Sequence, residues 1–317
     1  MVNQALELKP FVNSEHTGDY VEVLLPGELP QPKKSKKEKE AEADQELAQE
    51  REPLYERVKI HYAEAGTGEP LILVHTVGQS LYTWRKQFQR LSEYYRVIAV
   101  DLPGHGYSDR PYTFGYTVQE QADILRLFMD AMGIESAHMV GFSLGAMYVL
   151  DFLRRFPERS GRAILISPGG ITPEMPLLIR MLDSPILGAI AALLINLKTV
   201  RSLLEESCFD LTGITDEIVR EYYKTIADSE SKRAVRMSVH NFEEEEVLKE
   251  LRNIRQDILI LYGIEDKWRT MEELNILLAA LPNSRLVTLR NTGHLAHEEK
   301  PERLIEAVLE HIPVIAE

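Results

Sequence analysis

The chain has 317 residues, a hydrophobic content of 44% and a net charge of −14. This length and hydrophobic content suffice for one large core, and the negative charge argues against nucleic acid and anionic membrane surfaces as partners. The single cysteine, Cys208, excludes an intramolecular disulfide. Since residues 1–7 also lack the pattern of a secretory signal, we expect a cytoplasmic protein.

Two stretches of alternating sequence stand in the N-terminal part of the chain. Residues 20–25 and 55–62 each alternate apolar and polar side chains, which predicts the first two strands of a sheet. Between them, residues 33–52 begin with lysines and end with acids, the reverse of the order that a helix dipole favours. We interpret this segment as a solvated linker, with a docking tail as the alternative.

The most informative motif is Gly141-Phe142-Ser143-Leu144-Gly145. It comes directly after the apolar run 137–140, which predicts a buried strand, and precedes residues 146–153, which predict a helix. A serine between a strand and a helix, flanked by glycines, is typical of a nucleophile held on a sharp turn. Because the motif consists of common residues, its weight depends on whether partners for the serine occur later in the chain.

A serine hydroxyl needs a base to take its proton and an acid to orient that base. Asp266 lies just beyond the predicted strand 257–262, and His294 lies just beyond the predicted strand 285–289. Both positions are at the ends of strands, where open α/β sheets place catalytic groups. We therefore predict Ser143, Asp266 and His294 as the catalytic residues, with the adjacent Glu265 as a weaker candidate for the acid.

The chain resembles an α/β-hydrolase of the lid-bearing group that includes carboxylesterases, carbon–carbon bond hydrolases, perhydrolases and haloalkane dehalogenases. Besides the order Ser…Asp…His, the resemblance rests on the strand 70–75, on the D-x-P-G-x-G-x-S segment 101–108 and on Gly293-His294. It implies an α/β fold with a mostly parallel central sheet, helices on both faces and an inserted helical lid. The core is expected over 57–170 and 249–317, the lid over 171–248, and residues 1–56 form an N-terminal extension.

By the same resemblance, the backbone N–H groups of Val77 and Leu144 form the oxyanion hole. The family usually has His-Gly at the start of this loop, whereas this chain has His75-Thr76. Because threonine restricts a turn where glycine is usual, the shape of the loop is open. The donors themselves belong to the backbone, so the replacement need not remove them.

Several other polar residues are interpreted as structural. His75 and Asp101 end buried strands, where they can bond backbone groups, and His105 and His297 are assigned to turns or packing. The sequence has no Cys/His cluster, phosphate loop or dinucleotide fingerprint, so neither a metal nor a cofactor is expected.

The apolar stretch 185–197 falls within the predicted lid. At thirteen residues it is too short to span a bilayer. We predict that it forms a buried lid helix and an apolar ceiling over an acyl pocket, in preference to membrane docking, and expect no stable membrane insertion.

These observations predict a serine hydrolase that cleaves small to medium hydrophobic carboxylic esters through an acyl-enzyme. A serine nucleophile argues against dehalogenase and epoxide hydrolase activity, since by resemblance those members use aspartate there. Carbon–carbon bond hydrolysis remains open, although such members typically have a Gly-Pro-Gly oxyanion loop. A non-catalytic ligand receptor is a further alternative; the natural substrate and the oligomeric state are open as well.

Overall fold

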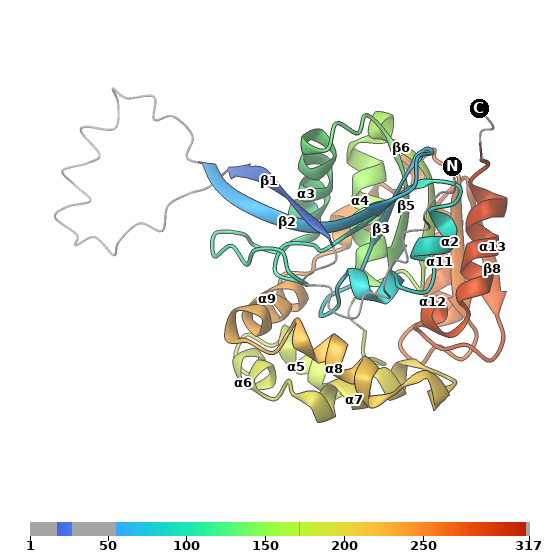
Figure 1. The fold of residues 1–317 in the computed structure, drawn as a ribbon. Coiled ribbons are helices and arrows are strands. Elements are labelled where there is room, and N and C mark those ends of the chain that lie inside the picture. Colours follow the sequence, from blue (N-terminus) through green and yellow to red (C-terminus); the bar gives the residue numbers. More distant parts are fainter. Residues whose placement is uncertain (1–17, 27–54, 171, 315–317) are drawn as a thin grey trace, which may run out of the picture.

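The computed structural model describes residues 18–26, 55–170 and 172–314. Over these residues the chain forms an eight-stranded sheet flanked by helices (Figure 1). The interpretation of residues 33–52 as a linker lies outside the described residues.

The sheet has the order β1-β2-β4-β3-β5-β6-β7-β8. β1 and β2 are antiparallel to each other and β2 is antiparallel to β4, whereas all the other neighbouring pairs are parallel. The predicted mostly parallel sheet is thus confirmed. The strands are β1 (Asp19–Pro26), β2 (Tyr55–Ala65), β3 (Pro70–Val74), β4 (Arg96–Val100), β5 (Ala137–Phe142), β6 (Ser160–Ile166), β7 (Ile258–Gly263) and β8 (Ser284–Leu289).

The first two strands pair as the alternating sequences predict. Pro26 lies opposite Tyr55, and the ladder continues to Asp19 opposite Tyr62. Val23 on β1 and its partner Val58 on β2 are both buried in the core. The alternation therefore reflects a ribbon with one face on the core and one toward solvent.

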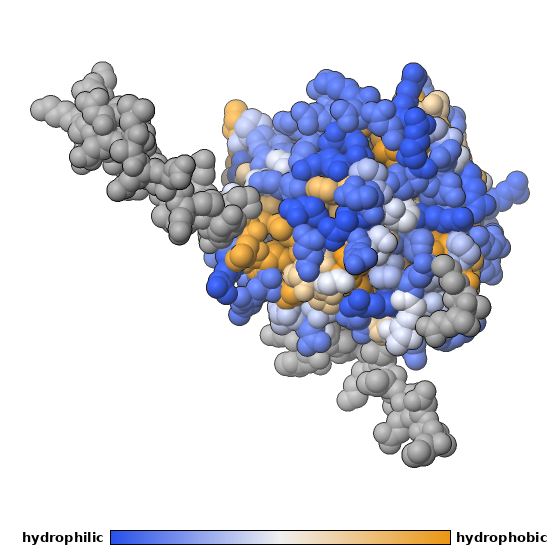
Figure 2. Space-filling view, turned by 90° about the horizontal axis from the view of Figure 1, so that it is seen from above, coloured by the Kyte–Doolittle hydropathy of each residue, from blue (hydrophilic) through white to orange (hydrophobic). Residues whose placement is uncertain are grey.

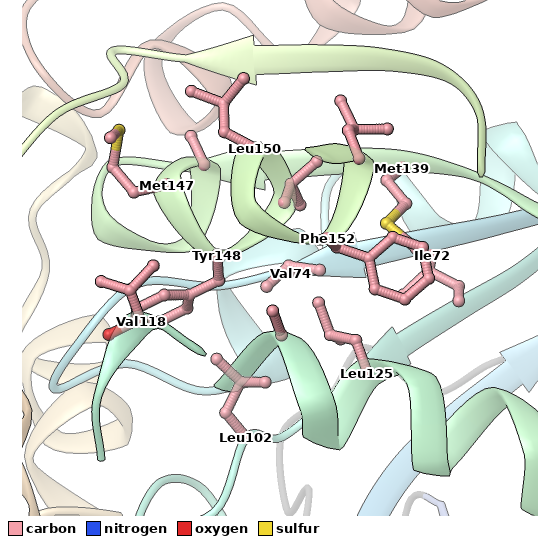
Figure 3. Close-up of a cluster of buried hydrophobic side chains, with 14 of the residues drawn as sticks. Ile72, Val74, Leu102, Val118, Leu125, Met139, Met147, Tyr148, Leu150 and Phe152 are labelled. Carbon is pink, nitrogen blue, oxygen red and sulfur yellow. The ribbon is translucent and has the colours of Figure 1, made fainter. Parts of the chain in front are cut away.

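Successive side chains of the central strands point to opposite faces, so the sheet separates two apolar clusters. On β3, Ile72 and Val74 belong to one cluster, and Leu71 and Leu73 to the other. Figure 3 shows part of the first cluster, where Ile72, Val74 and Met139 from the strands meet side chains of α3 and α4. Helices thus cover both faces, as the predicted fold class requires.

The first cluster is covered by α3 (Val118–Ala131), α4 (Leu144–Arg155), α10 (Glu245–Lys249) and α11 (Met271–Ala280). The second face carries α2 (Phe88–Leu91), α12 (Ala296–Glu299) and α13 (Pro301–His311). Short 3-10 helices complete the connections: η3 (Leu81–Trp84), η4 (Pro157–Arg159), η5 (Leu211–Gly213) and η6 (Leu251–Asn253).

A helical insertion separates β6 from β7. It consists of α5 (Leu177–Asp183), α6 (Gly188–Leu193), α7 (Leu197–Ser207), α8 (Asp216–Lys224) and α9 (Ser229–His240). In Figure 1 these yellow and orange helices form a layer beneath the sheet. The predicted end of the lid, residue 248, lies inside α10, which packs on α4 of the core.

The prediction of a buried helix over residues 185–197 is wrong for most of its apolar side chains. Only 188–193 form α6, and Ile186 and Leu193 are 81% and 77% exposed. α6 packs one side, including Ala191, against α5 and α9, and a single short helix cannot bury its whole circumference this way.

The face of the molecule opposite the helical insertion is mainly hydrophilic. Figure 2 views this face from above, and its surface is largely hydrophilic with a few hydrophobic patches.

Among the helices of the described part, none has the length and apolar character needed to cross a membrane.

Candidate active site

Ser143 lies at the sharp turn between β5 and α4. Its backbone has φ 53° and ψ −119°, a conformation that costs energy for a residue with a side chain. The turn is tight because a Cβ on Gly141 would lie 2.7 Å from the Ala146 Cα, and one on Gly145 would lie 2.2 Å from the His75 carbonyl oxygen. Both glycines are therefore required by close approach of the backbone.

The three residues predicted from the sequence lie together. Ser143 Oγ is 3.1 Å from His294 Nε2, and His294 Nδ1 is 2.8 Å from Asp266 Oδ2. Since the carboxylate accepts the Nδ1 proton, Nε2 is left to accept the hydroxyl proton. All three side chains are buried. The arrangement can move a proton from the hydroxyl onto an imidazole whose charge the carboxylate stabilises.

The loop after β7 fixes the Asp266 carboxylate. Its Oδ1 accepts hydrogen bonds from the Trp268 and Arg269 backbone N–H groups, at 2.8 and 3.1 Å. Burial opposes ionisation, but the neighbouring His294 and the hydrogen bond from the Trp268 N–H outweigh it and hold the pKa of Asp266 below its usual value. Glu265, the weaker candidate, accepts the Thr292 N–H instead.

Two aromatic side chains hold the His294 ring. Trp268 lies 4.8 Å from it between ring centroids, at an interplanar angle of 36°, and Phe142 lies at 5.0 Å. Sequence reasoning missed Trp268. Its position two residues after the predicted acid, within the same loop, is the signal that could have placed it at the site.

The loop after β3 accommodates threonine at position 76 because the residue with positive φ in this loop is Gly78. The Gln79 N–H donates to the Thr76 carbonyl oxygen at 3.2 Å, and Gly78, the third residue of this turn, has φ +71°. A glycine with positive φ at this place is what a type II turn requires. The loop thus turns without a glycine at position 76, and Val77 lies inside the turn.

The Thr76 hydroxyl reaches the predicted oxyanion hole. The Leu144 backbone N–H donates to Thr76 Oγ1 at 3.2 Å. Thr76 is buried and, like Val77, Leu144 and Ser143, lines the cavity beside the nucleophile. Sequence reasoning considered only the backbone of Thr76 and missed this side-chain contact.

His75 and Asp101 have the structural roles predicted for them. The His75 Nε2 accepts the Leu102 N–H at 3.0 Å, so its Nδ1 carries the proton and donates to the Thr76 carbonyl at 2.7 Å. Asp101 accepts the Leu81 and Tyr107 N–H groups and pairs with His61. These bonds tie the loop after β3 to the segment after β4.

His105 and His297 are also not part of the hydrogen-bonded group of Ser143, His294 and Asp266. His105 Nδ1 bonds the Pro103 carbonyl, and His297 Nε2 bonds the Thr83 hydroxyl. Burial lowers the pKa of each to about 3, so both are neutral near pH 7.

A cavity of about 110 Å³ opens beside Ser143 and His294. Its wall is formed largely by aliphatic side chains of the helical insertion, and no Asp, Glu, Lys or Arg is among the described residues that line it. Ile195, from the apolar stretch 185–197, is one of the lining residues. Others are Leu178, Leu182, Leu204, Ile226 and Val239.

Among the described residues, no group of three or more His, Cys, Asp or Glu side chains is arranged to hold a metal ion. Cys208 is buried, and burial raises the pKa of its thiol to about 12. Its thiol is therefore not a candidate nucleophile near pH 7.

Comparison with known proteins agrees with this architecture. The model of the alpha/beta hydrolase fold family matches residues 69–301. A 2-hydroxy-6-oxo-6-phenylhexa-2,4-dienoate hydrolase from Comamonas testosteroni is 29% identical, over 77% of this chain and 87% of that protein. An uncharacterized hydrolase from Bacillus subtilis is 28% identical, over 80% of this chain and 92% of its own length.

The solved structures include similar folds. A meta-cleavage product hydrolase from Pseudomonas fluorescens superposes with a TM-score of 0.70 at 25% identity, over 80% of this chain and 94% of that one. The family model covers well over half of the sequence. The chain therefore belongs to the alpha/beta hydrolase fold family.

Proposed function

We propose that this protein is a serine hydrolase that cleaves carboxylic esters of small to medium hydrophobic substrates, with Ser143, His294 and Asp266 as its catalytic residues. The observation that carries the proposal is the hydrogen-bonded chain from Ser143 Oγ through His294 to Asp266. Its members are buried beside a cavity, so a bound substrate would meet the nucleophile away from bulk water.

The reaction proceeds in two halves. Ser143 Oγ attacks the ester carbonyl while His294 Nε2 takes the hydroxyl proton, and the Val77 and Leu144 N–H groups stabilise the oxyanion. His294 then gives this proton to the departing alkoxide, which leaves the acyl group on Ser143. In the second half His294 removes a proton from water, the resulting hydroxide attacks the acyl carbon, and the acid leaves as Ser143 regains its proton.

The lining of the cavity supports an uncharged, apolar substrate group. Leu178, Leu182 and other aliphatic side chains of α5, α7 and α9 face this space, and a buried charge without a partner would be costly there. We include in the proposal that the helical insertion acts as a lid, which selects the substrate and excludes water.

Carbon–carbon bond hydrolysis is the second candidate, and the relatives favour it. The Comamonas testosteroni hydrolase is named for a dienoate, and the Pseudomonas fluorescens enzyme for a meta-cleavage product. A dienoate carries a carboxylate, whereas no lysine or arginine is among the described residues that line the cavity. This lining supports an ester ahead of a dienoate.

The test is steady-state hydrolysis of p-nitrophenyl esters from acetate to palmitate, with wild type and Ser143→Ala. We expect turnover by the wild type with an optimum at one chain length, and a loss of about 10⁴-fold or more in kcat for the variant. Turnover of a vinylogous 1,5-diketone dienoate but of no ester would support the second candidate. Turnover undiminished in Ser143→Ala would contradict both.

A further inference from the structure

We propose that the Thr76 hydroxyl is a third, side-chain donor of the oxyanion hole. The inference rests on the proposed function, because it assigns a further catalytic residue to the same reaction. It starts from one contact: the Leu144 N–H, itself a proposed oxyanion donor, points at Thr76 Oγ1 over 3.2 Å.

The geometry allows one substrate oxygen to meet both groups. Two atoms 3.2 Å apart can both lie within about 2.9 Å of a third atom, which is the length of an ordinary hydrogen bond. Thr76, Leu144 and Ser143 all line the same cavity, and we place this third position in it. A carbonyl oxygen placed there would contact the N–H and the hydroxyl together.

The hydroxyl has a proton to give. Before substrate binds, its oxygen is the acceptor of the Leu144 N–H, so the hydroxyl's own proton is not used in this contact. Since Thr76 is only 7% exposed, bulk water competes little for that proton. Charge developing on the substrate oxygen would therefore strengthen the bond in the transition state, which is where it contributes to the rate.

The surrounding structure holds Thr76 in place. Its carbonyl oxygen accepts hydrogen bonds from His75 Nδ1, at 2.7 Å, and from the Gln79 N–H, at 3.2 Å. A donor that is positioned before the substrate arrives does not have to reorganise during the reaction. The substitution of threonine for the family's usual glycine thus adds a functional group at a fixed place.

The alternative role for the Thr76 hydroxyl is to block the oxyanion hole, and it predicts a faster reaction when the hydroxyl is removed. If the hydroxyl only occupied the hole, the substrate oxygen would have to displace it from the Leu144 N–H, and removing the hydroxyl would speed the reaction. Thr76→Val keeps the size of the side chain and removes the hydroxyl, so the direction of its effect separates the two roles. Thr76→Ser keeps the hydroxyl and is the matched control.

The experiment measures kcat and KM for the best p-nitrophenyl ester, together with the rate at which a fluorophosphonate labels Ser143. In labelling, Ser143 Oγ bonds to phosphorus, fluoride leaves and His294 takes the proton, while the phosphoryl oxygen occupies the hole. We expect Thr76→Val to lower kcat and the labelling rate by about 10²-fold with little change in KM. Thr76→Ser should stay within about tenfold of wild type, because its hydroxyl is retained.

Unchanged or faster labelling of Thr76→Val, with circular dichroism matching wild type, would overturn the proposal. The labelling readout does not depend on the substrate class. If wild type labels but hydrolyses no ester, the ester proposal fails and the role of Thr76 is still decided by the labelling rates. If wild type does not label at all, Ser143 is not an activated nucleophile and both proposals fail.

Discussion

At the scale of single residues, two adjacent acids offer a direct test of which one orients His294. Asp266 Oδ2 bonds the imidazole, whereas Glu265 bonds the Thr292 N–H of a neighbouring turn. We expect Asp266→Asn to lower kcat by about 10⁴-fold, because an amide in this position favours the wrong imidazole tautomer. Steady-state ester hydrolysis measures this effect.

Glu265→Gln is the matched control, since it makes the same change of charge one residue away. It should alter kcat by less than about tenfold, because the Glu265 side chain does not contact the imidazole. A loss in Glu265→Gln as large as in Asp266→Asn would show that the loop as a whole, rather than one carboxylate, supports the reaction.

The sequence identified the residues that the site brings together, but not all of their contacts. Ser143, Asp266 and His294 were predictable because each comes after a strand with a recognisable apolar pattern, and strand ends converge at one edge of a parallel sheet. The contact of Thr76 Oγ1 with the Leu144 N–H joins two loops 68 residues apart. No local pattern encodes such a contact, because it depends on how β3 and β5 register side by side.

At the scale of elements, a buried polar cluster joins the helical insertion to the core. The Tyr222 hydroxyl on α8 lies 2.6 Å from Glu298 Oε1 and 3.0 Å from Thr83 Oγ1. Burial raises the pKa of Tyr222 well above its usual value, so its hydroxyl stays a donor. Burial opposes ionisation of Glu298, but Arg85 outweighs it and holds the pKa of this carboxyl below its usual value. The cluster is therefore a charged anchor for α8.

Tyr222→Phe should weaken this anchor. The ring that lines the cavity is kept, while a hydrogen bond to a charged group is lost, which typically contributes about 1.5–3 kcal/mol. We expect the free energy of unfolding in urea to fall by about 2 kcal/mol. Tyr223→Phe, the same change at the next position of α8, should stay within about 0.5 kcal/mol of wild type. Equal stabilities of the two variants would contradict the anchor.

The elements differed in how well the sequence predicted them. The core strands and the hairpin of β1 and β2 were predictable, because period-two alternation and apolar runs directly reflect the two faces of a sheet. The burial of the stretch 185–197 could not be predicted, because apolar composition alone does not tell which side of a helix packs against a neighbour. Ala191 packs inward whereas Leu193, two residues later, is exposed.

At the scale of the whole molecule, buried neutral histidines make stability depend on pH. His105 and His297 have a pKa of about 3 in the folded protein, because burial disfavours their charged form. In the unfolded chain a histidine has a pKa of about 6.5. Below pH 6.5 the unfolded state therefore binds more protons than the folded state, and the free energy of unfolding falls as the pH is lowered.

Between pH 7 and pH 5, each of these histidines should lower the free energy of unfolding by about 2 kcal/mol. His75 and His311 act in the same direction, since burial lowers their pKa as well. The carboxylates Asp101, Asp266 and Glu298 have lowered pKa values, so the stability that they contribute is lost mainly below about pH 5. Over the window from pH 7 to pH 5, the buried histidines therefore dominate the change in the free energy of unfolding.

Urea unfolding at both pH values, in wild type and in His297→Gln, measures the contribution of one histidine. The variant also loses the bond to Thr83, which changes its stability at both pH values, so only the difference between the two pH values is compared. That difference should be smaller in His297→Gln by about 2 kcal/mol, because glutamine does not titrate. Equal differences in the two proteins would mean that His297 takes up a proton in the folded state over this pH range, which would contradict the lowering of its pKa by burial.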